Sequence, residues 1–389
     1  MKQRVELELQ SDLMCGGVRV SDNFLESEPF IRGSVLRAAF AKQILLECPL
    51  GDVPSPDGKL HYVMVKDADG ICADCPKRKV CEKFSEMRFS YAYIDGAFPA
   101  PFTARVCKTC GTAHPVQDTL VCGGMIRCSG CTDGLKRMES AKGFWKAENG
   151  AYRQVKPKIH LTTHTGIDRY TDTAKKGSLF SIRAIQKGTR FEAVIDDAGT
   201  DLLSVGDVLY CGKYASNGFG KLKIVKLTSE PECTAETLKA RLDKFQNRFR
   251  KEKPDAENDA ALLFLSDACV EMNNSMEILT DDAYTRQWEK ALFGDGDLPF
   301  RLKTIVAETQ LYSGYDTSQK WGEWRAKTPE LHLLRGTSVL LEIQKNRYEE
   351  AVQLLLKLQE NGIGKKTADG YGQIAVCHEI HCKGVEHNG

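Results

Sequence analysis

The 389-residue chain lacks a strong net charge, because 54 Lys and Arg residues stand against 53 Asp and Glu residues. Overall charge therefore does not identify a nucleic-acid binder, although a local patch of cations is enough for phosphate contact. No apolar run approaches the roughly 18 residues that a membrane helix needs. The first ten residues, MKQRVELELQ, alternate and carry charges, so we expect no signal peptide, no membrane partner and a cytoplasmic location.

The sequence also lacks the phosphate-binding motifs of nucleotide-dependent enzymes. It contains no G-x-x-x-x-G-K-[ST] segment. Gly362-x-Gly364 follows a predicted helix and precedes a predicted strand, whereas a dinucleotide-binding fingerprint requires the strand first. These absences argue against a P-loop NTPase and a Rossmann dehydrogenase.

Cysteine is the residue type present in excess, with 15 in total and eight of them between positions 72 and 131. In a reducing compartment, clustered cysteines predict a metal site and not disulfides. Two C-x2-C turns, 17 residues apart, predict a tetrahedral structural zinc site with four thiolates: Cys107, Cys110, Cys128 and Cys131. His114 and Cys122 lie between the turns, either as bystanders or as substitute ligands.

A second cysteine cluster has weaker spacing. Cys72-x2-Cys75 is followed by Cys81, and Cys48 is a plausible fourth ligand. These residues form either a second zinc site or a group of reduced surface thiols. The other six cysteines show no ligand spacing and are mostly expected to be buried.

Periodicity predicts the elements of the first half. Alternation over 4–9 predicts a half-buried strand, and an apolar face over 35–46 predicts a helix with Ser34 as its N-cap. Residues 48–135 are predicted to be an insertion around the cysteines. Further strands are predicted near 61–66, 87–94, 151–164, 178–186, 189–196 and 221–227.

The second half repeats this order of elements. Strands are predicted at 261–266, 301–312, 337–344 and 373–380, with helices at 282–293 and 346–361. This β-α-β-β-α-β order is that of a ferredoxin-like unit, and the first half matches it with a much shorter second helix at 203–211. We therefore predict an α+β fold with two ferredoxin-like domains, 1–232 with the zinc-binding insertion and 259–389, joined by a basic helical linker at 233–258.

The helix predicted at 234–252 concentrates positive charge. Seven Lys and Arg residues lie between positions 239 and 253, against Asp243 and Glu252. The segment is either a solvated connecting helix or a surface that faces RNA or a protein partner.

A glycine-rich loop precedes the last predicted strand of each half, at 212–220 and 362–372. Glycines let the backbone approach a ligand closely and expose N–H groups to phosphate oxygens. Nearby cations and aromatic rings suit unpaired bases; they are Lys213, Lys221, Lys365, Lys366, Tyr214, Phe219 and Tyr371. The alternative is a pair of tight helix-to-strand turns with their aromatic rings packed inward.

Two segments, PFIRGSVLRAAF (29–40) and GIGKKTADGYGQI (362–374), resemble motifs of the RAMP superfamily of CRISPR-associated RNA-binding proteins. The segment at 312–343 resembles part of the subunit that caps the crRNA 5′ handle in type III effector complexes, a Cas-five-type subunit closest to the type III-D form, and 165–191 resembles the family's strand-loop-strand segment. The resemblance implies RRM-like domains in an antiviral complex. It also implies crRNA, repeated RAMP backbone subunits and a large subunit as partners, with target RNA contacted indirectly.

The resemblance further implies which residues contact RNA. Near the first helix these are Gly33, Ser34 and Arg37, and in the segment at 164–175 they are His164, Arg169 and Lys175. The first loop contributes Tyr214, Asn217, Gly218, Phe219 and Gly220. The second loop contributes Gly362, Gly364, Lys365, Lys366, Gly370, Tyr371 and Gly372.

Two other functions stay open at the level of sequence. A metal-independent endoribonuclease that matures crRNA needs a general base, an acid and cations, which His160, His164, Tyr170, Lys175 and Lys176 are able to supply. A zinc-containing protein adaptor needs no RNA contact. The histidines near the end, His378, His381 and His387, are interpreted as a polar tail or a partner contact.

Overall fold

The computed structural model describes residues 2–16, 18–21, 23–56, 58, 60, 62–111, 113–114, 116–122, 127–128, 130–131, 137–148, 151–254, 256, 258–272, 281–316 and 325–382. The chain divides into two compact units, and each contains discontinuous segments. Unit 1 comprises Met1–Gly96, Lys156–Pro231 and Tyr315–Ala326, and unit 2 comprises Ala97–Val155, Glu232–Gly314 and Lys327–Gly389. Within the described residues, no helix has the length and apolarity needed to span a membrane.

The main sheet of unit 1 has the order β15-β16-β1-β14-β4, and β5 also pairs with β14. Its strands are β1 (Lys2–Leu9), β4 (Arg88–Phe89), β5 (Tyr93–Ile94), β14 (Arg190–Asp196), β15 (Val208–Tyr210) and β16 (Lys221–Ser229). The predicted alternation in β1 is confirmed, because Val5, Leu7 and Leu9 are fully buried. Helix α1 (Gly33–Glu47) packs against β4 and β15 through an apolar face that includes Leu36 and Phe40.

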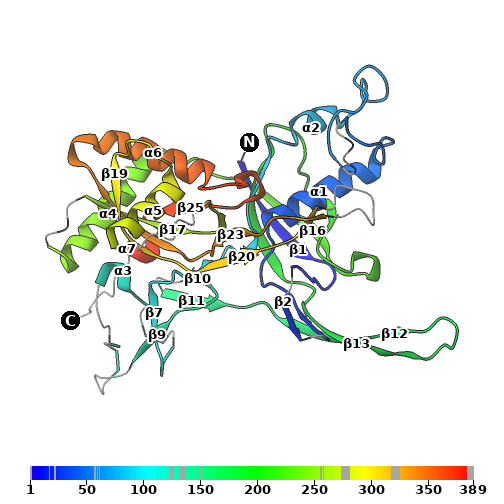
Figure 1. Ribbon diagram of the computed structural model, residues 1–389, viewed down its shortest axis with the longest axis horizontal. Coiled ribbons are helices and arrows are strands. Elements are labelled where there is room, and N and C mark those ends of the chain that lie inside the picture. The colour runs from blue at the N-terminus through cyan, green and yellow to red at the C-terminus, as the bar shows by residue number, and fades with distance from the viewer. Residues whose placement is uncertain are drawn as a thin grey trace. The chain divides into compact units, whose positions relative to one another are not determined.

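A second sheet of unit 1 contains a long hairpin. Strands β12 (Ile159–Ile167) and β13 (Ala174–Ile185) pair along their length, and β3 (Phe24–Glu26) and β2 (Val18–Ser21) extend the sheet from β13. The hairpin appears as one continuous ribbon (Figure 1). A two-stranded sheet of β21 (Tyr315–Asp316) and β22 (Arg325–Ala326) completes unit 1.

The main sheet of unit 2 has the order β19-β24-β17-β25 with antiparallel neighbours. In chain order the elements are β17 (Asp259–Phe264), α5 (Asp281–Phe293), β19 (Phe300–Val306), β24 (Ser338–Ile343), α6 (Tyr348–Asn361) and β25 (Ile374–Val376). This is the β-α-β-β-α-β arrangement that the sequence predicts for the second half. The main sheet of unit 1 has the same strand order, with α1 after β1 and a short helix α2 (Arg78–Lys83) before β4. Between β14 and β16, where every residue is described, the chain forms no α-helix.

All six residues of β17 are buried, because both faces of this sheet are covered within unit 2. On one face, Leu262 and Phe264 pack into the cluster that contains helix residues such as Trp288 and Val352. On the other face, Leu263 packs with Ala104 and Trp145. Residues 97–155 therefore belong to the core of unit 2, whereas we predicted residues 48–135 as an insertion in the first domain.

Segment 97–155 adds two small three-stranded sheets to unit 2, with the orders β8-β7-β9 and β11-β10-β6. Their elements are β6 (Phe98–Pro99), β7 (Ala104–Cys107), β8 (Gln117–Asp118), α3 (Thr119–Cys122), β9 (Met138–Ser140), β10 (Phe144–Glu148) and β11 (Ala151–Val155). A further sheet, β18-β23-β20, contains β18 (Ala268–Cys269), β20 (Thr309–Tyr312) and β23 (Glu330–Leu333).

The predicted basic helix is α4 (Ala235–Glu252), and it is a core element of unit 2 instead of a separate linker. Thr234 caps it through a capping box with Thr237. Leu238, Leu242 and Phe245 are fully buried, since the helix packs against β17 and α6. Several cations of its other face have acidic or amide partners, namely Lys239 with Glu349 (2.7 Å), Arg248 with Glu252 (3.0 Å) and Arg241 with Gln359 (3.1 Å).

Four local predictions are wrong. No strand forms in the described part of 61–66, and the short second helix expected at 203–211 is replaced by turns and β15. The last predicted strand ends at Val376, and α7 (Glu379–Cys382) follows. Arg32, not Ser34, is the N-cap of α1, and it makes no side-chain capping bond.

Candidate nucleic-acid interface and metal centre

The glycine loop of unit 1 has a specific backbone conformation. Tyr214 has the left-handed φ of 60°, a single 3₁₀ turn covers Ala215–Asn217, and Gly218 returns to positive φ at 88°. Gly212 and Gly220 also have positive φ values, 78° and 74°. β16 begins directly after Gly220.

The glycine loop of unit 2 has the same conformation, position by position. Lys366 has a φ of 60°, a 3₁₀ turn covers Thr367–Asp369, and Gly370 has a φ of 79°. Gly364 and Gly372 have φ values of 86° and 68°. The two loops align residue for residue over 212–220 and 364–372, which supports the duplication that the sequence suggests.

Equivalent hydrogen bonds hold both loops to the segment that follows the first strand of their unit. The bonds run from the amides of Lys213, Gly220, Lys365 and Gly372 to the carbonyls of Met14 (2.7 Å), Asp12 (2.7 Å), Cys269 (2.9 Å) and Asp267 (2.8 Å). A Cβ added at Gly220 would overlap the Cys211 carbonyl oxygen, and one added at Gly372 would overlap that of Ile363. These two glycines are therefore required for the close backbone approach within each loop.

The aromatic side chains of the first loop pack inward. Phe219 is buried, and it belongs to a cluster with Met14 and Ile182 that Tyr214 and Phe180 cover. The Phe180 and Tyr214 rings stack with centroids 6.3 Å apart. The inward packing that we left as the alternative is thus what this loop shows, and the loop presents Asn217 and Gly218 to solvent.

The lysines of the second loop have acidic partners. Lys365 Nζ pairs with Glu271, and Lys366 Nζ pairs with Glu330. The Lys366 hydrogen bond is the main reason why the pKa of Glu330 is lowered. Any phosphate that approaches these lysines must compete with a carboxylate already in place.

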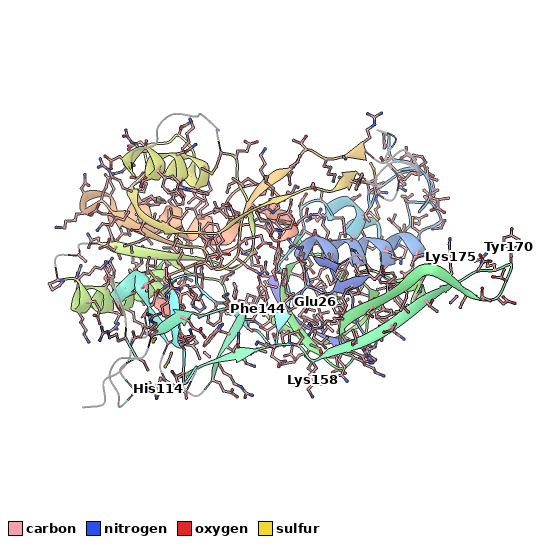
Figure 2. All side chains as sticks on the ribbon, turned by 60° about the horizontal axis from the view of Figure 1, so that its bottom comes forward. Glu26, His114, Phe144, Lys158, Tyr170 and Lys175 are labelled. Carbon is pink, nitrogen blue, oxygen red and sulfur yellow. The ribbon has the colours of Figure 1, made fainter. Side chains whose placement is uncertain are left out.

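The β12–β13 hairpin concentrates cations in unit 1. Between positions 156 and 187 the sequence has seven Lys and Arg residues against two Asp residues. Figure 2 shows Tyr170 at the turn of the hairpin, Lys175 nearby and Lys158 at the other end. Tyr170 is 99% exposed, so its ring is accessible for stacking. Arg169 and Lys175 are exposed as well.

The two histidines of β12 have partners within unit 1. His160 Nδ1 lies 2.5 Å from Asp12 Oδ2, and His164 Nε2 lies 3.1 Å from Thr162 Oγ1. The His164 ring stacks on Phe180 with centroids 5.4 Å apart. His164 therefore supports the loop packing, whereas His160 is more than half exposed at its side chain.

The residues predicted at the start of α1 have structural contacts. Gly33 is buried and Ser34 is half-buried. The Arg37 guanidinium donates to the Phe84 carbonyl (3.0 Å) and lies over the Phe84 ring. Arg32, which stands where the RAMP pattern has proline, is buried and pairs with Glu28 at 2.6 Å.

Unit 2 brings the predicted zinc ligands together. Cys131 Sγ lies 3.7 Å from Cys107 Sγ and 3.6 Å from Cys110 Sγ, close to the ~3.8 Å edge of a tetrahedron with zinc–sulfur bonds of about 2.3 Å. His114 Nδ1 lies 3.0 Å from Cys128 Sγ. The residues thus fit a tetrahedral metal ion.

The set of ligand atoms that lie mutually within 4.8 Å contains His114 in place of Cys110, together with Cys107, Cys128 and Cys131. His114 is therefore a candidate ligand and not simply a bystander. A hydrogen bond from the Cys110 amide is the main cause that lowers the pKa of Cys107 to about 6. Burial raises the pKa of Cys131 to about 12. The Cys110 amide thus favours the thiolate of Cys107, the form that binds metal.

The second cysteine cluster is looser. Burial raises the pKa of Cys81 to about 11, and the nearby Cys48, Cys75 and Cys72 raise it further. The four residues are therefore neighbours in unit 1, but among the described residues they do not form a set with all ligand atoms within 4.8 Å.

Sequence reasoning missed one buried polar pair. His381, expected in a polar tail, is 1% exposed, and its Nδ1 lies 2.5 Å from Asp118 Oδ2. Burial alone would raise the pKa of Asp118, but the charge and hydrogen bond of His381 lower it. His378 packs on Phe98, while His387 lies outside the described residues. No local spacing signals this pair, because 263 residues separate its members.

No family model and no curated protein matches the chain. A chain of the type III-B Cmr-beta complex bound to cognate target RNA and AMPPnP is 13% identical, with a TM-score of 0.42 over 90% of this chain and 93% of that one. A chain of type III-B Cmr-beta bound to cognate target RNA gives 13% and 0.41 over 91% and 94%. A chain of a type IV-B CRISPR complex gives 12% and 0.29 over 60% and 96%. Because these likenesses are distant, we derive the function from the chain's own residues.

Proposed function

We propose that this protein is a structural, RNA-binding subunit of a type III CRISPR effector complex that caps the crRNA 5′ handle and anchors neighbouring Cas subunits in antiviral defence. The observation that carries the proposal is the pair of superimposable glycine loops, each placed before the last strand of a sheet with the same strand order. Both units would then be ferredoxin-like RAMP domains. The RAMP-like segments at 29–40, 165–191 and 362–374 support the superfamily, and the segment at 312–343 supports the assignment to the handle-capping subunit.

The loops and the hairpin offer complementary contacts to RNA. Glycines at positive φ allow a phosphate to approach the backbone, as at Gly218, whose Cβ position is open space. The hairpin adds Arg169 and Lys175 for phosphates and the Tyr170 ring for a base. Exposed Leu161, Ile167 and Leu179 lie on the same hairpin, and they suit contact with a repeated RAMP subunit or with the large subunit.

Structural zinc at the Cys107–Cys131 region would stabilise unit 2. The bound ion would hold together the turns at either end of the segment, and Val106 beside them packs in the same cluster as Leu263 of the central strand. Cys48, Cys72, Cys75 and Cys81 are proposed as a second zinc site, in which binding of the ion would draw the four sulfur atoms closer together than they lie in this structure. Elemental analysis of the wild type and of a Cys75→Ser variant tests the second site, because the variant loses one zinc ion per chain only if that site is occupied.

The test is native purification with the products of neighbouring genes, followed by sequencing of the bound RNA. We expect crRNA that begins with a repeat-derived 5′ handle. Arg169→Glu with Lys175→Glu should reduce the bound RNA at least tenfold, whereas Lys357→Glu, an exposed charge on α6, should leave it unchanged. Equal recovery of RNA with the Arg169→Glu, Lys175→Glu double variant and with the Lys357→Glu control would contradict the proposal.

A metal-independent endoribonuclease is the alternative, and one observation favours it. The Asp12 carboxylate holds His160 Nδ1 at 2.5 Å, an arrangement that orients an imidazole for general-base chemistry. Purified protein incubated with repeat RNA and EDTA would then give a discrete product that His160→Ala or His164→Ala abolishes. Intact RNA after incubation with well-folded protein would eliminate this function.

A further inference from the structure

Three side chains with metal-binding atoms meet on the β18-β23-β20 sheet of unit 2. Cys269 and His332 are directly opposite each other in the antiparallel pairing of β18 with β23. Such residues have Cβ atoms about 4.5–5.5 Å apart. Glu330 lies two residues before His332, so its side chain is on the same face of the strand.

The three ligand atoms lie mutually within 4.8 Å. Cys269 and His332 are 3% and 2% exposed, and Glu330 lies at the surface with 37% of its side chain exposed. The His332 ring is fixed between Tyr312 (4.7 Å between centroids) and Tyr371 (5.3 Å). Within the described residues, nothing hydrogen-bonds the buried His332 Nδ1.

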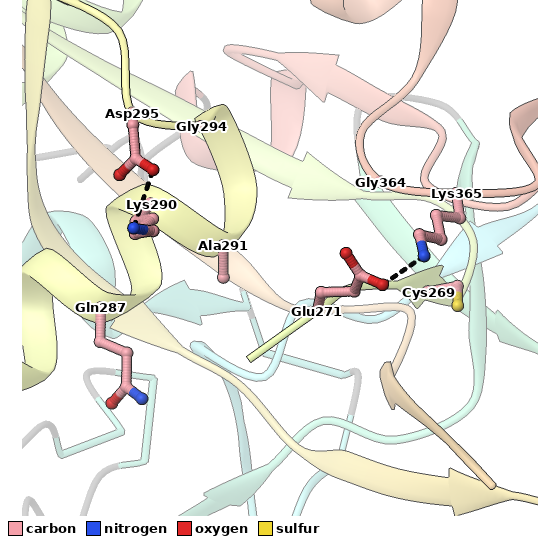
Figure 3. Close-up of a pocket in the computed structure, with 9 residues that line it drawn as sticks. All are labelled: Cys269, Glu271, Gln287, Lys290, Ala291, Gly294, Asp295, Gly364 and Lys365. Carbon is pink, nitrogen blue, oxygen red and sulfur yellow. Dashed lines mark hydrogen bonds and ion pairs between the residues drawn. The ribbon is translucent and has the colours of Figure 1, made fainter. Parts of the chain in front are cut away.

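A cavity of about 350 Å³ borders this cluster at Cys269, one of its three members. Cys269, Gly364 and Lys365 line it on one side, and Figure 3 shows the Cys269 sulfur close to the Lys365–Glu271 ion pair. The cluster thus lies next to a cavity at Cys269, while Glu330 brings it to the protein surface.

The equivalent place in unit 1 has a different chemistry. The Lys213 and Lys365 amides make the same hydrogen bond, and their acceptors are Met14 and Cys269. Met14 packs in an apolar cluster with Phe219. The duplicated scaffold thus tolerates an apolar filling, and the sulfur, imidazole and carboxylate of unit 2 are not required by the loop conformation.

We propose that Cys269, Glu330 and His332 bind a divalent transition-metal ion of the zinc type, with a fourth position left to water. One thiolate, one imidazole and one carboxylate are a donor set that zinc accepts. Without the ion, the Lys366 ammonium pairs with Glu330 and supplies the positive charge. Metal binding displaces this ammonium and turns Lys366 away from Glu330.

The experiment measures zinc per chain in the full-length protein after equilibration with Zn²⁺ and removal of unbound ion. Cys269→Ser and Glu330→Gln should each lower the content by one ion per chain relative to the wild type. Cys211→Ser, also a buried cysteine, should leave it unchanged, because no described metal-binding group includes Cys211. Glu330 is partly exposed, so its amide variant is expected to fold.

Two outcomes would overturn the proposal. The first is wild-type zinc content in both Cys269→Ser and Glu330→Gln. The second concerns Lys366→Met, which should raise the zinc affinity of this site several-fold because it removes the competing ammonium; unchanged affinity would refute the displacement. RNA binding enters neither measurement, so these results do not depend on the proposed function.

Discussion

Gly372→Ala should destabilise unit 2 far more than Gly294→Ala. Both glycines have positive φ values, but only at Gly294 is there open space for the added Cβ. Gly372 has a φ of 68°, and a Cβ there would lie 2.8 Å from the Ile363 carbonyl carbon and closer still to its oxygen. Gly294 has a φ of 85° with nothing within 4 Å of the added Cβ. Both variants bear the left-handed penalty of about 1–2 kcal/mol.

The additional cost at Gly372 comes from the Ile363 backbone. The Ile363 amide donates to the Gly372 carbonyl at 2.8 Å, so the overlap is relieved only by weakening this bond and shifting packed backbone. A lost hydrogen bond costs about 0.5–1.5 kcal/mol and overpacking about 1–3 kcal/mol. We therefore expect Gly372→Ala to cost about 3–6 kcal/mol and Gly294→Ala about 1–2 kcal/mol.

Urea unfolding followed by tryptophan fluorescence measures this difference, because Trp145 and Trp288 are buried in unit 2. The slope of the free energy against urea should be the same in both variants, so the midpoints report stability directly. Equal midpoints for Gly372→Ala and Gly294→Ala would refute the steric argument, and with it the requirement for glycine at this position of the loop.

Three further predictions concern the metal site and the core of unit 2. His114→Ala should weaken zinc binding more than Cys110→Ser, because the set of ligand atoms within 4.8 Å contains His114 and not Cys110. Competition with a chromophoric chelator measures both affinities. A larger loss of zinc affinity in Cys110→Ser would instead support the site with four thiolates. Asp118→Asn should cost about 3–5 kcal/mol near neutral pH, because it leaves a buried histidine without its charged partner. Since the pKa of Asp118 is lowered on folding, its contribution is present above the unfolded value of about 3.9 and is lost as the pH falls below it, so urea midpoints of wild type and variant should converge in acid. Phe245→Ala on α4 should cost about 3–5 kcal/mol in urea unfolding, whereas a connecting helix outside the core would lose little.

Much of the architecture of unit 2 is predictable from local pattern. The apolar faces of 282–293 and 346–361 predict α5 and α6 within two residues, and the runs at 261–266 and 337–344 predict β17 and β24. These segments bury one continuous face or both faces, so periodicity or hydrophobicity alone identifies them. The glycine loops are also predictable, because their conformation depends on residues that tolerate positive φ.

The other features depend on contacts distant in sequence. Nothing in the local sequence of 97–155 indicates that its apolar side chains pack on β17, which follows more than a hundred residues later. Sequence pattern alone therefore assigns its cysteine-rich part to the first domain. The Asp118–His381 pair and the Cys269–His332 pair have the same character, since only strand or helix packing brings their members together. For the histidines of 378–381, local polarity indicates a tail, whereas burial against Phe98 and Asp118 determines their role.

The two glycine loops show how one backbone conformation serves two surfaces. Two equivalent backbone hydrogen bonds hold each loop, so neither conformation depends on the side chain at the left-handed position, which is Tyr214 in unit 1 and Lys366 in unit 2. In unit 1 the side chain at that position packs on the hairpin, and it joins the loop to the most cationic segment of the unit. In unit 2 the side chain at that position pairs with Glu330. The same loop backbone therefore supports an aromatic contact to the hairpin in unit 1 and an ion pair at the loop in unit 2.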